Sequence, residues 1–179
     1  MNMNTELESL VKFKTVARSM TLWLVDDDDE YRESLAGQLR CELEIHSLRQ
    51  FSSAELAAAA LVKGPPPDLI LLDIHTGGMS ALEALGPMKE IAPSTRVLVM
   101  TTVRDFDVEI AVFAAGADGF ISKLIPFEGI LDWVRNSRRT PPASGRISRP
   151  WIESSEEDAA QPTSILQRLL RFVQTAPRS

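Results

Sequence analysis

Short apolar runs alternate with amphipathic stretches along most of this chain. Five of the runs have the length and composition of buried β-strands, and apolar residues at helical spacing follow each of them. The predicted strands cover residues 22–25, 43–48, 68–73, 96–100 and 118–122. The predicted helices follow the acidic run 26–30 to about residue 40, and then cover residues 56–62, 80–91, 105–116 and 128–135.

Alternating strands and helices with short connections favour one parallel sheet that helices cover on both faces. The run 68–75 is apolar on both faces, as a central strand is, and three prolines precede it. The strand order expected at this size is flavodoxin-like, with ligands bound beyond the carboxyl ends of the strands. Pro87 lies inside the predicted helix 80–91, so we expect a kink or a break there. The predicted fold class is α/β: a doubly wound five-stranded parallel sheet with a mostly linker-like C-terminal tail.

Composition narrows the choice of function. The 179 residues include a 44% hydrophobic share, enough for a real core, and a single cysteine, which excludes an intrachain disulfide and a thiolate metal site. No apolar stretch approaches the roughly 18 residues of a membrane span, and charged residues interrupt the first 20 positions, so we expect no membrane segment and a cytoplasmic protein. Residues 1–135 carry a net charge of −9 and residues 136–179 one of +3. An acidic body is a poor match for nucleic acid, and we expect no nucleic-acid binding by this chain.

The two ends of the chain lack the alternation of strands and helices predicted for its central part. Residues 1–20 form an N-terminal extension with a predicted short helix, residues 21–138 form the domain, and residues 139–162 have the composition of a linker. Residues 163–175 form one more amphipathic helix, which either packs on the domain or frays, or else pairs with a partner or a twin helix. A helix-turn-helix needs more helices than this tail has room for.

Candidate chemistry lies where four predicted strands end. Asp26 and Asp27 follow the first strand, Asp73 ends the third, and Thr101 and Lys123 follow the fourth and fifth. One of the next acids, Asp28 or Asp29, is explained as a helix cap, but a cap does not explain the first two. Carboxylates suit Mg²⁺, and three carboxylates with a hydroxyl and an ammonium suit phosphoryl chemistry on a carboxylate nucleophile.

These residues, in this order, resemble the receiver domain of two-component response regulators. The paired acids of the family match Asp26 and Asp27 after Val25, and its phospho-accepting aspartate matches Asp73 in the run 67–73. Its strand-terminal hydroxyl and lysine match Thr101 and Lys123. The switch aromatic, three residues before that lysine, is Phe120. The resemblance covers residues 21 to 138, about two-thirds of the chain.

The resemblance implies a phosphorelay switch. A histidine kinase or a histidine phosphotransfer protein would phosphorylate Asp73, with Mg²⁺ held by Asp26, Asp27, Asp73 and the backbone carbonyl of His75. Thr101 and Lys123 would then move toward the phosphoryl group and change the surface of helix 105–116, strand 118–122 and helix 128–135. That surface would meet a downstream protein or a second copy of the chain. We expect no enzyme: a hydrolase of this kind needs a second acid two residues after the nucleophile, where His75 stands.

Some positions depart from the family pattern. The family usually has proline and glycine four and eight residues after the acceptor, where this chain has Gly77 and Ala81, and Thr102 is bulkier than the usual neighbour of the hydroxyl. These departures leave open a pseudo-receiver, a constitutive protein-binding module that does not cycle phosphate. Two residues separate Lys123 from Pro126, a spacing similar to receivers that precede LuxR-type DNA-binding domains, although no such output domain follows in this sequence.

Overall fold

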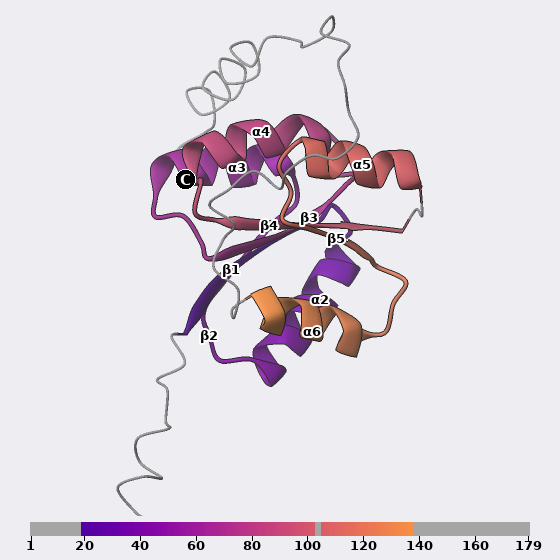
Figure 1. Cartoon of the computed structure of the whole chain (residues 1–179). Coiled ribbons are helices and arrows are strands. Elements are labelled where there is room, and N and C mark those ends of the chain that lie inside the picture. Colours follow the sequence, from indigo (N-terminus) through magenta and orange to yellow (C-terminus); the bar gives the residue numbers. More distant parts are fainter. Residues whose placement is uncertain (1–18, 103–104, 138–179) are drawn as a thin grey trace, which may run out of the picture.

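The computed structural model describes residues 19–102 and 105–137. One parallel sheet with the strand order β2-β1-β3-β4-β5 forms its centre (Figure 1). The strands are β1 Met20–Val25, β2 Ile45–Phe51, β3 Leu69–Asp73, β4 Arg96–Thr101 and β5 Gly119–Ser122. The helices are α2 Asp29–Glu42, α3 Ala54–Lys63, α4 Ala81–Ile91, α5 Phe106–Ala114 and α6 Phe127–Ser137. The predicted doubly wound α/β fold is confirmed, and the segments predicted before residue 19 and after residue 137 lie outside the described residues.

Helices cover the sheet on both faces, α3, α4 and α5 on one and α2 and α6 on the other (Figure 1). Successive side chains of a strand point to opposite faces, so each central strand supplies both layers. On β3, Ile70 and Leu72 join the α3–α4 layer, and Leu69 and Leu71 join the α2–α6 layer. All five β3 residues are buried. This two-sided burial explains why the sequence signal of the central strand is a continuous apolar run.

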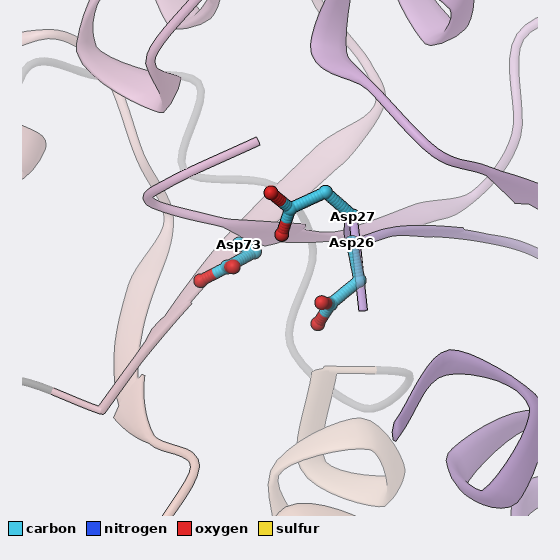
Figure 2. A group of neighbouring side chains, drawn as sticks. All are labelled: Asp26, Asp27 and Asp73. Carbon is cyan, nitrogen blue, oxygen red and sulfur yellow. The ribbon is translucent and has the colours of Figure 1, made fainter. Parts of the chain in front are cut away.

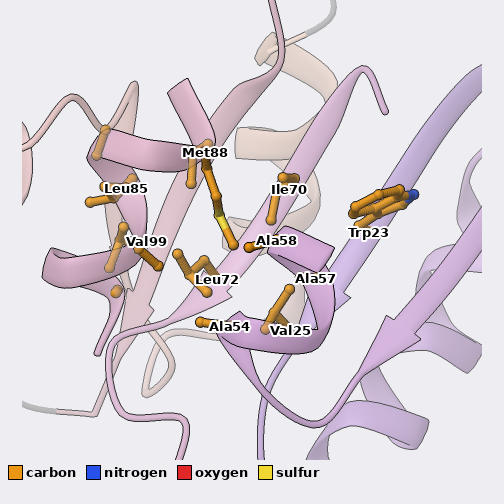
Figure 3. Packing of buried hydrophobic residues seen from close by; sticks show 14 of the residues in the cluster. Trp23, Val25, Ala54, Ala57, Ala58, Ile70, Leu72, Leu85, Met88 and Val99 are labelled. Atoms are coloured by element: carbon orange, nitrogen blue, oxygen red, sulfur yellow. The ribbon is translucent and has the colours of Figure 1, made fainter. Parts of the chain in front are cut away.

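The α3 layer is built from small side chains. Of the five buried residues of α3, four are alanines. Three of them, Ala54, Ala57 and Ala58, belong to the core cluster that includes residues of β1 and β3 (Figure 3). Alanine favours the helix and leaves little bulk between the helix axis and the sheet. The helix begins at the N-cap Ser53, whose hydroxyl accepts the N–H of Leu56. The Ala54 N–H donates to Thr76 Oγ1 in the loop after β3, so the first turn of α3 lies close to the carboxyl end of that strand.

Strand β2 differs from the prediction in its bounds. The prediction placed it at residues 43–48, whereas it covers Ile45–Phe51. None of its residues is fully buried, as befits the edge of the sheet, so the hydrophobic pattern marks it weakly. Phe51 pairs with Val25 and packs on Trp23 with ring centroids 4.8 Å apart, which extends the strand beyond the predicted end.

The sequence predicted a kink or a break at Pro87, and helix α4 continues through this residue, so the break is wrong. A proline inside a helix costs about 3 kcal/mol. Leu85 and Met88 are almost inaccessible to solvent, and the burial of each stabilises the fold by about 1.5–3 kcal/mol. A capping box between Ser80 and Glu83 also fixes the start of the helix. Tertiary packing thus outweighs the local preference for a break.

None of the helices within residues 19–102 and 105–137 is long and apolar enough to span a bilayer.

Candidate functional site

The strand register brings the predicted site residues to one edge of the sheet. All neighbouring strands are parallel, so their carboxyl ends meet at that edge. The aligned residues nearest to it are Val25 with Leu72, Asp73 with Met100, and Thr101 with Ser122. Asp26 and Lys123 come directly after the first and last of these strands. The structure therefore brings together the residues that the sequence placed on four separate strands.

Three carboxylates form the acidic side of the site (Figure 2). One oxygen from each of Asp26, Asp27 and Asp73 lies within 4.8 Å of the other two. Asp26 is fully buried and Asp73 is 6% exposed, whereas Asp27 is exposed. Asp26 is held from two sides, because its backbone N–H donates to the carbonyl of Phe51 and its Oδ1 accepts the N–H of Asp28.

Lys123 forms the basic side of the site. Its Nζ lies 2.7 Å from Asp26 Oδ2 and 2.9 Å from Asp73 Oδ2. Its backbone N–H donates to the carbonyl of Thr101 at 2.7 Å, which continues the β4–β5 ladder by one residue. The side chain is 9% exposed, so these ion pairs lie in a region that water screens poorly.

The protonation equilibria of the two partners respond to this burial. Burial raises the pKa of Asp26, and the neighbouring Lys123 only partly offsets that rise. Burial by itself would lower the pKa of Lys123, but its bonds to Asp26 and Asp73 outweigh burial and raise it. The lysine is therefore charged at neutral pH. A buried carboxylate whose ionised form is disfavoured is typical of a site kept for function rather than for stability.

Tyr31 belongs to this site, and sequence reasoning missed it. Lys123 Nζ lies over the Tyr31 ring, 4.7 Å from its centroid, in a cation–π arrangement. Burial, together with the negative charges of Asp26 and Asp73, raises the pKa of the Tyr31 hydroxyl from 10.0 to about 12. Tyr31 occupies the first turn of α2, two residues after its first helical position. Its position directly after the acidic run was the feature of the sequence that could have indicated a place in the site.

The acidic loop is held by groups of its own helix. Asp28 caps α2 by accepting the N–H of Tyr31 at 3.0 Å, which confirms one of the two predicted caps. Arg32 Nη1 donates to the backbone carbonyl of Asp26 at 2.6 Å, and the same guanidinium pairs with Asp29. Arg32 was also missed, although its place one turn after the capping aspartate faces it toward the loop. The four successive aspartates thus have separate surroundings.

The remaining predicted residues lie around the carboxylates. The Thr101 side chain is fully buried at the end of β4. Phe120 is half-buried, aligned with Val99 and packed on the α3–α4 layer. The His75 side chain is exposed, and the use of its backbone carbonyl as a metal ligand stays a prediction. Gly77 adopts the left-handed region, with φ +60°, and a Cβ there would lie 3.3 Å from Asp27 Oδ2.

The donor set fits a hard divalent cation. Carboxylate oxygens are the ligands that Mg²⁺ prefers, and it completes its shell with water and phosphate oxygens. Three carboxylates and one ammonium give the cluster a formal charge of −2, which a divalent cation balances. Burial raises the pKa of Asp26, and a bound cation would oppose that rise by stabilising the ionised carboxylate.

Comparison with known proteins agrees with this geometry. Residues 22–135 match the family described as response regulator receiver domain. The response regulator protein VraR of Staphylococcus aureus is 31% identical over 116 residues, which are 64% of this chain and 54% of VraR. The protein-glutamate methylesterase/protein-glutamine glutaminase of Agrobacterium fabrum is 28% identical over 148 residues, 79% of this chain and 40% of that enzyme. The transcriptional regulatory protein KdpE of Mycobacterium tuberculosis is 26% identical over 136 residues, 75% of this chain and 58% of KdpE.

Solved structures support the same fold. The BeF3-activated DrrB receiver domain superposes with a TM-score of 0.60 at 23% identity, covering 68% of this chain and 99% of DrrB. A CheY-like response regulator receiver domain protein from Methanospirillum hungatei gives 0.62 at 21% identity, with 68% of this chain and 94% of that one. The chain spans 40–58% of the length of the sequence relatives named above, so their whole activities do not transfer to it. With the family match over residues 22–135, this chain belongs to the receiver domains of two-component response regulators.

Proposed function

We propose that Asp73 accepts a phosphoryl group and that its aspartyl phosphate switches a protein-interaction surface. The observation that carries the proposal is the placement of the Asp73 carboxylate, 2.9 Å from Lys123 Nζ and beside two further carboxylates at the strand ends. An Asp73 oxygen attacks phosphorus, the P–N bond of a donor phosphohistidine breaks, and the electron pair of that bond leaves with the imidazole. The product is an acyl phosphate on Asp73.

The neighbours of Asp73 have separate roles in this step. Asp26, Asp27, Asp73 and the backbone carbonyl of His75 would hold Mg²⁺, which when bound neutralises charge on the transferred group. Lys123, whose Nζ lies 2.9 Å from Asp73 Oδ2, would supply a positive charge to the phosphoryl oxygens. Thr101 is buried at the end of β4, and its hydroxyl would donate a hydrogen bond to the phosphoryl group once that group is in place.

The switch would act through the surface of α5, β5 and α6. Movement of Thr101 toward the phosphoryl group leaves room for Phe120, which starts from a half-buried position. Helix α5 already exposes three large apolar residues at helical spacing, Phe106, Ile110 and Phe113, and the first of them is 74% exposed. Such a stripe on a surface helix is typical of a protein contact. A downstream protein or a second copy of the chain would bind there.

The phosphodonor would be a histidine kinase or a histidine phosphotransfer protein in the cytoplasm. The family assignment and the intact set of five chemical positions support this partner. The acidic body of the chain supports a protein rather than a nucleic-acid partner.

Incubation of the full chain with Mg²⁺ and acetyl phosphate, followed by intact mass measurement, tests the proposal. We expect a phosphoryl adduct on the wild type that disappears without Mg²⁺ and in Asp73→Asn. Asp132→Asn, which changes an exposed carboxylate on α6, is the matched control and keeps the adduct. A wild type that stays unmodified, and whose oligomeric state beryllofluoride does not change, would instead support the pseudo-receiver.

A further inference from the structure

The loop between β3 and α4, residues 74–80, lacks the family's usual proline and is nevertheless well anchored. At its ends, Ile74 N–H donates to the Met100 carbonyl at 2.9 Å and Ala81 N–H to the Ile74 carbonyl at 3.2 Å. Inside it, the hydroxyl of Thr76 donates to the carbonyl of Met79 at 2.8 Å. Thr76 is 2% exposed, so this bond is shielded from water.

A second anchor comes from the first turn of α3. The Met79 N–H donates to Glu55 Oε1 at 2.5 Å, and the Ala54 N–H donates to Thr76 Oγ1 at 3.4 Å. Hydrogen bonds to a carboxylate are stronger than those between neutral groups. Glu55 Oε2 is buried and has no hydrogen-bond partner among the described residues. One carboxylate oxygen of Glu55 therefore loses its hydrogen bonds to water, while the other accepts a hydrogen bond from the loop.

Gly78 makes this contact possible. A Cβ at residue 78 would collide with the Glu55 carboxylate, whose nearest atom is Oε1. The φ of Gly78 is not in the left-handed region, so close approach rather than backbone conformation requires a glycine. Gly77 differs, because its φ of +60° lies in the left-handed region and a Cβ there would lie 3.3 Å from Asp27 Oδ2. A Cβ at Gly77 would thus approach an aspartate of the site, whereas one at Gly78 would approach Glu55.

We propose that Glu55 is a positioning residue for Mg²⁺ binding, acting as a clamp on the loop 74–80. The clamp holds the loop at Met79, and the same loop contains His75, whose carbonyl is a predicted ligand, and Gly77, where a Cβ would lie 3.3 Å from Asp27 Oδ2. Partners that orient metal ligands typically change metal affinity 10- to 100-fold when they are removed. The inference rests on the proposed function, because Mg²⁺ binding at the three aspartates is part of it.

Two variants break the clamp in different ways. Glu55→Ala removes the acceptor and its charge, whereas Gly78→Ala keeps the charge and pushes the carboxylate away from Met79. Calorimetric titration of the full chain with MgCl₂ should show a Kd about 10-fold higher in both. Glu55→Gln retains an acceptor oxygen of the same reach, and we expect its Kd within about 3-fold of the wild type.

Two matched controls separate the clamp from general effects. Gly86→Ala adds a Cβ with open space around it, in the helix that follows the loop. Glu128→Ala removes an exposed acid from the first turn of α6, so it repeats the loss of a charge at a helix start. We expect the Mg²⁺ affinity of both to equal that of the wild type.

Amide hydrogen exchange in the absence of metal measures directly whether the Met79 N–H is hydrogen-bonded to Glu55. The Met79 N–H should exchange at least about 10-fold faster in Glu55→Ala and Gly78→Ala, below the temperature of global unfolding. Unchanged Mg²⁺ affinity in variants whose Met79 amide has been released would overturn the inference. Weaker binding in Glu55→Ala but not in Gly78→Ala would overturn it too, because charge alone would then be responsible. A wild type that binds no Mg²⁺ would refute the proposed function and the inference together.

Discussion

The two sides of the site are built in different ways. On the Lys123 side, the ion pairs join Asp26 after β1, Asp73 at the end of β3 and Lys123 after β5, and each position matches the family pattern. On the side of the loop 74–80, Gly77 and Ala81 depart from that pattern. There the Glu55 side chain of α3 accepts the N–H of Met79, and the Ala54 N–H of α3 donates to the Thr76 side chain. Chemistry that acts on the phosphoryl group needs particular side chains at fixed places. A loop that presents a backbone carbonyl needs only to be held, which different contacts can do.

The largest effect we expect tests the Lys123 side. Lys123→Ala leaves two buried carboxylates without their shared counter-charge, and the phosphorylation rate should fall about 100- to 1000-fold. The rate is measured with acetyl phosphate and saturating Mg²⁺. Lys89→Ala is the control, because Lys89 also pairs with an aspartate, Asp118, but near the amino ends of β4 and β5. A rate equal to the wild type in Lys123→Ala would refute the role of the lysine.

The next prediction tests the loop side by restoring the family's residue. Proline fixes φ near −65°, so Gly77→Pro cannot adopt the observed φ of +60°. We expect an Mg²⁺ affinity about 10-fold lower and a free energy of unfolding lower by about 1–3 kcal/mol, from calorimetry and urea unfolding. If Gly77→Pro instead binds Mg²⁺ more tightly, the loop has a second, family-like conformation and the contrast between the two sides disappears.

A pH prediction returns to the Lys123 side. Tyr31 is the sole tyrosine of the chain, so absorbance at alkaline pH follows its ionisation alone, and the folded protein should show a pKa of about 12. Because this pKa exceeds that of the unfolded chain, the folded state holds the extra proton between pH 10 and 12. This proton stabilises the folded state fully below pH 10. As the pH rises from 10 to 12 the contribution is lost, and the free energy of unfolding should fall by about 2–3 kcal/mol. A titration midpoint near 10 would contradict the burial of this hydroxyl.

The smallest expected effect is that of Tyr31→Phe. The hydroxyl is buried without a hydrogen-bond partner among the described residues, so its removal should change the free energy of unfolding by less than about 1 kcal/mol. The ring stays under Lys123 and the phosphorylation rate should remain within about 2-fold of the wild type. Tyr31→Leu removes the ring and should slow the reaction more. Equal rates in the two variants would show that the ring does not position the lysine.

The sequence predicted the carboxyl ends of β1, β3, β4 and β5, which carry the site, better than it predicted the end of β2 or the contacts between elements. Asp26, Asp73, Thr101 and Lys123 were found because each directly follows or ends an apolar run, and parallel strands end together. Glu55 was missed as a loop contact because 24 residues separate it from Met79 and only the packing of α3 brings them together. The continuous helix at Pro87 shows the same limit, since burial of its neighbours overrides a local signal.

The alanines of α3 have a consequence for the variation that this domain tolerates. They let the helix lie close to β1 and β3, and the reach of one glutamate side chain to the loop depends on that closeness (Figure 3). Larger side chains at Ala57 or Ala58 would move the helix outward and lift Glu55 from the loop. Residues with no functional group of their own would thus tune the affinity for a metal ion as well as the stability of the fold.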